Sequence, residues 1–128
     1  MSNYKLFLLA GTFFGAVGVI LGAFGAHALR KSLSPELLSA YQTGVLYQLV
    51  HALALIAVAL AARDLAGPLL NAAGVFLLIG IVFFSGSLYI LALTSFKFIG
   101  ILTPVGGVAF IAGWAMFFMA AWKWQVPF

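Results

Sequence analysis

Polar side chains recur at helical spacing at Tyr41, Gln48 and His51 in a largely apolar sequence, and Tyr47 precedes His51 by four residues. Residues three, four or seven positions apart lie on one face of an α-helix, so these side chains would form a polar stripe. An imidazole near phenol and amide groups could line a pathway for a small solute or ion, although one histidine without an intramembrane acid is a poor proton relay. It could instead stay neutral and hold helices together by hydrogen bonds.

A second polar group ends the first apolar run, in the segment GAFGAHALRK. Because His27 and Arg30 are three residues apart, they would share a helix face, and either could bind helix-end carbonyls or a polar group on a neighbouring helix. Alternatively, Arg30 extends to water at the edge of a membrane span. With three hydroxyl-bearing residues from the second half of the chain, the candidate polar site comprises His27, Arg30, Tyr47, Gln48, His51, Ser85, Tyr89 and Thr103.

The composition shows which elements must position these side chains. Of the 128 residues, 66% are hydrophobic and only 6% are charged, whereas soluble domains carry about 25% charged residues. Eight charged side chains cannot cover a water-soluble core of this size. The sequence therefore predicts an integral membrane protein whose main partner is the lipid bilayer.

Four uncharged runs lie between the charged residues, and each exceeds the roughly 20 residues that cross a bilayer. Pro35, Pro68 and Pro104 fit the first turns of helices, where proline is tolerated. We expect an all-α fold: an integral membrane four-helix bundle with short loops, forming one transmembrane domain over residues 1–128. The expected helices lie near residues 4–29, 35–62, 68–93 and 104–123.

The charges do not set the orientation of these four spans. Three lysine and arginine residues are expected on the side of the termini and three on the opposite side, so the positive-inside rule has no imbalance on which to act. Within the second span, His51 would lie about 16 Å from Ala62 at the usual helical rise, close to the bilayer midplane. An ionisable group at that depth is a candidate for function.

Templates for catalysis are missing. The two acidic residues, Glu36 and Asp64, are expected on opposite faces of the membrane, which excludes a paired-carboxylate mechanism. Cysteine is absent, which excludes disulfides, thiolate nucleophiles and cysteine-ligated metals. The basic residues are too few and scattered for nucleic-acid binding. The sequence thus predicts no catalytic residue, metal or cofactor, and favours a protein that is not an enzyme.

Glycines recur along the first span at alternating spacings of four and three residues, which places them on one stripe of the helix. Such a stripe lets the backbone of a second helix approach closely, within the protein or between copies. The expected packing residues are Gly11, Gly15, Gly18, Gly22 and Gly25.

Four motifs in order, GAFGAHALRK, YQTGVLYQLVHALAL, FSGSLYILALT and TPVGGVAFIAGW, give the chain a resemblance to a known family. Along essentially its full length the chain resembles the domain of unknown function 423 family, small four-helix membrane proteins to which transmembrane protein 256 of animals is related. The resemblance implies a multi-pass protein of the bacterial inner membrane and no established activity. Family motifs map onto His27, Ala28, Tyr47, Gln48, His51, Ala52, Ser85, Gly86, Tyr89, Thr103, Pro104, Gly106 and Gly107.

Three functions remain open from the sequence. The first is an interaction, assembly or accessory protein whose glycine face receives another helix, in a homo-oligomer or a larger membrane complex. The second is a pathway for a small solute or ion along the stripe of Tyr41, Gln48 and His51. The third is an intramembrane redox or lipid-modifying enzyme, which is supported only by the histidines and tyrosines.

Overall fold

The computed structural model describes residues 3–127, and the regular secondary structure in this part of the chain is entirely helical. The elements are α1 (Asn3–His27), the short 3-10 helix η1 (Leu29–Lys31), α2 (Pro35–Leu65), α3 (Pro68–Gly80), the π-helical turn η2 (Ile81–Ser85), α4 (Gly86–Thr94), the 3-10 helix η3 (Lys97–Ile101) and α5 (Leu102–Trp122). Four segments are long and apolar enough to cross a membrane, and α3, η2 and α4 together form one of them. The all-α fold with four spans is confirmed.

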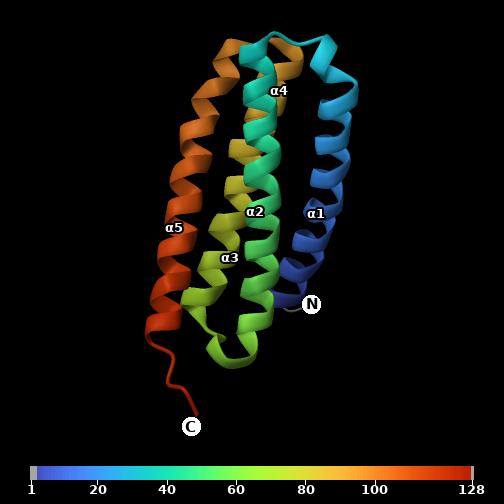
Figure 1. Cartoon of the computed structure of the whole chain (residues 1–128). Coiled ribbons are helices and arrows are strands. Elements are labelled where there is room, and N and C mark those ends of the chain that lie inside the picture. The colour runs from blue at the N-terminus through green and yellow to red at the C-terminus, as the bar shows by residue number, and fades with distance from the viewer. Residues whose placement is uncertain (1–2, 128) are drawn as a thin grey trace.

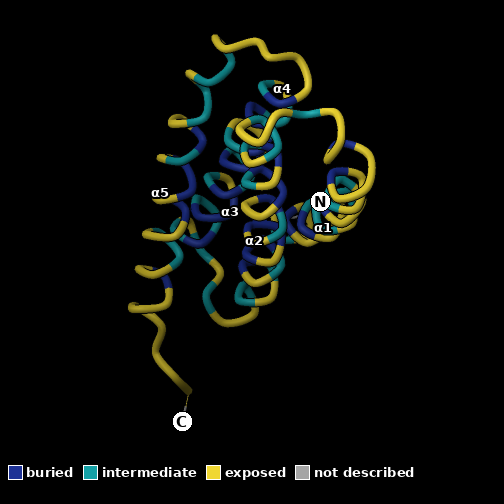
Figure 2. Tube along the Cα trace, turned by 45° about the horizontal axis from the view of Figure 1, so that its top comes forward, coloured by how far each residue is buried: buried dark blue, intermediate teal, exposed yellow. Residues whose placement is uncertain are grey.

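The spans run side by side in alternating directions, and the two labelled ends of the chain lie at the same end of the bundle (Figure 1). Within it, α1 packs mainly on α2, and α5 packs mainly on α3 and η2. The buried residues follow the inner faces of α2 and of the α3–α4 span, while much of α1 and α5 is exposed (Figure 2). The outer helices therefore present most of the surface that meets lipid.

The helix boundaries depart from the expected ones by a few residues. α1 ends at His27, so Arg30 lies in η1 and does not continue the face of α1. α2 starts as its sequence indicates, because the Ser34 hydroxyl accepts a hydrogen bond from the Leu37 N–H at 3.2 Å and Pro35 occupies the first helical position.

At its other end α2 extends to Leu65. The last span departs more, since η3 leads directly into α5 at Leu102. Thr103 and Pro104 lie inside the first turn of α5, and the Thr103 hydroxyl bonds to another helix and does not cap its own.

The π-helical turn η2 widens the third span where α5 crosses it. Its extra residue per turn is visible in the hydrogen bond from the Gly86 N–H to the Ile81 carbonyl, five residues earlier. Gly106 of α5 lies against this turn: a Cβ atom added there would stand 2.2 Å from the Phe84 backbone nitrogen. Only glycine allows this backbone contact, so the π-turn and Gly106 determine the α5 packing together.

Three of the five predicted packing glycines of α1 lie buried against α2. An added Cβ would stand 2.8 Å from the Ala52 carbonyl oxygen at Gly11 and would overlap α2 side chains at Gly18 and Gly25. At Gly22 it would reach a Val45 methyl group at 3.3 Å.

Gly15 differs from the other four glycines, because an added Cβ would meet no atom within 4 Å. At 3.6 residues per turn Gly15 is rotated about 40° from Gly11, which places it at the edge of the stripe. The stripe is thus largely occupied within the protein, and its Gly15 edge is open.

Two glycine-to-alanine substitutions test the contact between Gly106 and η2. Gly106→Ala should destabilise the protein by about 1–3 kcal/mol, because the new methyl group forces backbone atoms apart. Gly86→Ala should be neutral or stabilising, because Gly86 is helical and its Cβ position is empty. Unfolding free energies measured in lipid bicelles test this, and equal effects of the two changes would contradict the proposed contact.

Candidate functional site

Gln48 is the centre of the buried polar network and is only 2% exposed. Its side-chain Nε2 donates a hydrogen bond to the Phe14 carbonyl of α1 at 2.9 Å. The Tyr89 hydroxyl of α4 donates to its Oε1 at 2.6 Å. The amide therefore joins three of the four spans at one level.

The neighbouring polar groups on this face also bond to carbonyl oxygens of other helices. The Tyr41 hydroxyl donates to the Leu21 carbonyl of α1 at 2.5 Å, and Ser85 of η2 donates to the Gly44 carbonyl of α2 at 2.7 Å. A backbone carbonyl has two lone pairs, so it can accept such a bond while keeping its helical one. The Tyr41 ring also packs against the Tyr89 ring, with centroids 5.4 Å apart.

His51 has a partner on each ring nitrogen. Nδ1 lies 2.7 Å from the Tyr47 carbonyl oxygen of the preceding turn, and the indole Nε1–H of Trp114 donates to Nε2 at 2.9 Å. Because an indole only donates and a carbonyl only accepts, the ring is neutral with its proton on Nδ1. Phe110 stacks on the ring with centroids 3.5 Å apart. To bind a proton or metal, His51 would have to lose one of these bonds.

Tyr47 is the exception among the intramembrane candidates. Its ring packs against Phe84 at a centroid distance of 4.6 Å and stacks beside His51 at 5.9 Å. The side chain is 40% exposed, and its hydroxyl has no hydrogen-bond partner within residues 3–127.

Thr103 and Ser87 link the last two spans. Their hydroxyl oxygens lie 2.5 Å apart, and Ser87 also bonds to the Phe84 carbonyl at 2.9 Å. Six of the eight candidates predicted from the sequence therefore lie where helices meet: Tyr47, Gln48, His51, Ser85, Tyr89 and Thr103.

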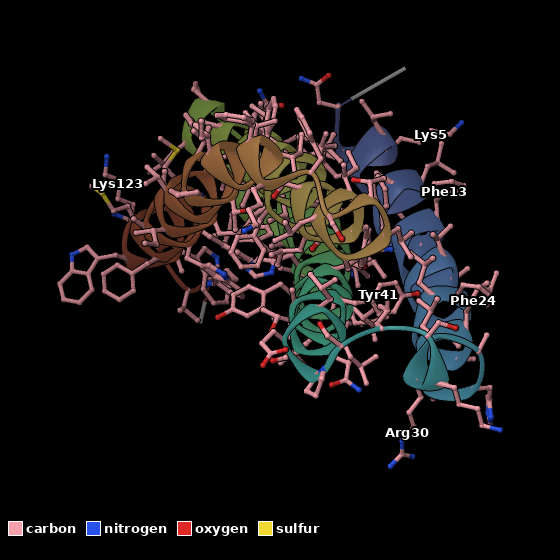
Figure 3. All side chains as sticks on the ribbon, turned by 90° about the horizontal axis from the view of Figure 1, so that it is seen from above. Lys5, Phe13, Phe24, Arg30, Tyr41 and Lys123 are labelled. Carbon is pink, nitrogen blue, oxygen red and sulfur yellow. The ribbon has the colours of Figure 1, made fainter. Side chains whose placement is uncertain are left out.

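His27 and Arg30 lie apart from this network. Both are exposed, and neither forms a hydrogen bond or ion pair with any other residue in the part of the chain that the structure describes. Figure 3 shows the Arg30 side chain extending away from the bundle. The structure does not bring this pair to the network, because α1 ends at His27 and Arg30 lies in the 3-10 turn that follows.

Sequence reasoning missed Trp114 and Phe110. Nothing in the motifs indicates that Trp114 approaches His51, 63 residues away. The available signal was chemical: a tryptophan within an apolar span carries an N–H donor that needs an acceptor.

Taken together, the polar groups form internal cross-links between spans. Within residues 3–127, no buried side-chain nitrogen or oxygen lacks a partner. No group of three metal-ligating side chains of the histidine, cysteine or acidic types occurs there either. The arrangement is suited to holding helices in register.

Two tyrosine-to-phenylalanine substitutions compare a hydroxyl group that forms a hydrogen bond with one that forms none. Tyr89→Phe should lower the free energy of unfolding by about 0.6–1.7 kcal/mol, because it leaves the Gln48 Oε1 unpaired. Tyr47→Phe should change it by less than about 0.5 kcal/mol. Steric-trap unfolding in bicelles measures both, and a larger loss for Tyr47→Phe than for Tyr89→Phe would refute the assignment.

Comparison with known proteins agrees with the structure. A family described as a protein of unknown function, DUF423, matches residues 21–107. The chain is 45% identical to the UPF0382 membrane protein YwdK of Bacillus subtilis, covering 94% of this chain and 98% of that protein. A UPF0382 membrane protein of Staphylococcus epidermidis is 42% identical, over 93% of this chain and 97% of its own length.

The UPF0382 inner membrane protein YgdD of Escherichia coli is 41% identical over 91% of this chain and 89% of its own length. No solved structure matches. The names of these relatives confirm the predicted membrane location, and the predicted family is confirmed too. With four apolar spans and a family match across more than half of its length, the chain belongs to the DUF423 family of membrane proteins.

Proposed function

We propose that the protein is an assembly or accessory component of the bacterial inner membrane that receives another transmembrane helix between α1 and α2. The partner helix would come from a second copy or from a larger membrane complex. The observation that carries this proposal is the open groove beside Gly15.

The groove measures about 460 Å³ and is almost wholly apolar. Gly15 and Ala16 of α1 form its small-residue floor, while Val19 and Leu53 on its rim are 64% and 67% exposed. The Thr12 hydroxyl, which also lines it, bonds back to the Leu8 and Leu9 carbonyls of α1. The groove therefore leaves no polar group in need of a partner.

Physical chemistry favours a helix in such a groove. Lipid tails are as apolar as leucine, so membrane helices associate through close contact and not through exclusion of water. A floor without large side chains lets a partner backbone approach closely, whereas the raised sides give it lateral contacts. The competing occupant is a lipid acyl chain, which would fill the groove without assembly.

The other two functions have less support. A pathway along Tyr41, Gln48 and His51 would require breaking hydrogen bonds that join the spans. An intramembrane enzyme would need a reactive group, whereas both nitrogens of His51 are occupied. These hydrogen bonds favour a structural role for the polar stripe. The open groove remains the better candidate for binding a partner.

Filling the groove tests the proposal. Ala16→Leu should reduce the assembled fraction about tenfold, equivalent to about 1.4 kcal/mol, because the new side chain occupies the partner's place. Ala115→Leu, also on an exposed helical face but on α5, should leave assembly unchanged. Native mass spectrometry of particles released directly from membranes measures the assembled fraction.

Two outcomes would contradict the proposal. A wild-type protein that is released only as a monomer with lipid would mean that the groove holds acyl chains. An equal loss of assembly in both variants would mean that assembly does not depend on this groove.

A further inference from the structure

The hollow at the terminal end of the bundle has the chemistry of an anion site. We propose that it binds the phosphate headgroup of an anionic membrane lipid. The hollow measures about 660 Å³ and lies between the α2–α3 connection and the segment after α5. Arg63, Asp64, Lys123 and Trp124 all line it.

Its depth matches the headgroup region. The uncharged run of α2 ends at Ala62, and α5 ends at Trp122, so the hollow begins where two apolar spans stop. Figure 1 shows the α2–α3 connection and the C-terminal segment at this same end of the bundle. Trp122, which is 80% exposed, and Trp124 are of the type that anchors proteins at this interface.

Two cations from distant parts of the sequence meet at the hollow. Arg63 follows the second span and Lys123 follows the last, and neither forms an ion pair with any residue that the structure describes. The planar guanidinium of Arg63 can hold two phosphate oxygens at once, and Lys123 adds a second positive charge. Asp64 opposes them, which leaves a net charge of one positive unit among these three side chains.

The start of α3 adds a donor from the backbone. Its cap residue, Gly67, gives no side-chain cap, and the Gly67 N–H is already bonded to the Tyr4 hydroxyl at 2.8 Å. The N–H group of Leu69, which is only partly buried, has no hydrogen-bond partner in the described chain. Leu69 lines the hollow. Free N–H groups at the positive end of a helix bind phosphate oxygens.

A lipid satisfies all of these features at once. Its phosphate would meet Arg63, Lys123 and the start of α3, while its glycerol and upper acyl chains would meet the apolar lining, which includes Leu65 and Ala120. A free phosphate ion would use the same donors without the apolar wall. Inorganic phosphate is therefore the comparison that distinguishes the two sources.

The test is lipid binding by the full chain in detergent, followed by native mass spectrometry and thermal unfolding. Phosphatidylglycerol should bind about tenfold more tightly than phosphatidylcholine and should raise the Tm. The double variant Arg63→Gln, Lys123→Gln should lose this preference. The control Arg30→Gln, Lys31→Gln removes the same charge at the opposite end and should keep it.

Asp64→Asn keeps the proposal testable if the double variant folds poorly, because it removes the opposing charge and should tighten phosphatidylglycerol binding several-fold. Four results would overturn the proposal: no preference for the anionic lipid, an equal loss in the Arg30 and Lys31 control, unchanged or weaker binding by Asp64→Asn, or stabilisation by inorganic phosphate equal to that by the lipid.

Discussion

The fold depends on one constraint of the hydrocarbon interior, where a polar group finds no water and must be satisfied within the protein. Gln48 shows how strongly this constraint acts. Its amide has one donor bound to the Phe14 carbonyl of α1 and its oxygen bound to the Tyr89 hydroxyl of α4. Displacing either span would leave a buried amide group unpaired, so this side chain sets the register of three spans.

Glycines make these hydrogen bonds geometrically feasible. An added Cβ at Gly18 would lie 3.4 Å from the Gln48 Nε2 and would overlap Leu49, so Gly18 gives α2 room to approach α1. Gly44 does the same for the Tyr89 ring, which would lie 2.8 Å from an added Cβ. The glycine and polar stripes, which the sequence presents as separate features, therefore act as one packing device.

Much of this arrangement could be predicted because it follows from local rules. Charge-free runs and prolines indicate four spans, and helical spacing puts Gln48 and His51 on one face. Three features could not be predicted in this way: the π-turn, the Gly106 contact and the approach of Trp114 to His51. They depend on how helices that are distant in the sequence cross. The spacing of residues along a single helix does not indicate that crossing. The shared face of His27 and Arg30 could not be predicted from helical spacing either, because a short 3-10 turn follows His27.

The molecule has two kinds of surface: inner faces that hydrogen bonds link to one another, and open outer surfaces where we propose that partners bind. Most polar side chains within the spans form hydrogen bonds inside the bundle. The groove beside Gly15 and the hollow at the terminal end remain open at the surface. The residues whose types first suggest chemistry are therefore not the residues that we propose bind a partner. The polar stripe therefore has a structural role, which is to hold the spans together.

A double-mutant cycle between Gln48 and Tyr89 tests that claim most directly. The unfolding free energies of wild type, Gln48→Met, Tyr89→Phe and the double variant would be measured in bicelles. The hydrogen bond predicts a coupling energy of about 0.6–1.7 kcal/mol, the range found for such bonds in membranes. A coupling energy indistinguishable from zero would contradict the account, since Gln48 and Tyr89 would then not hold the spans together.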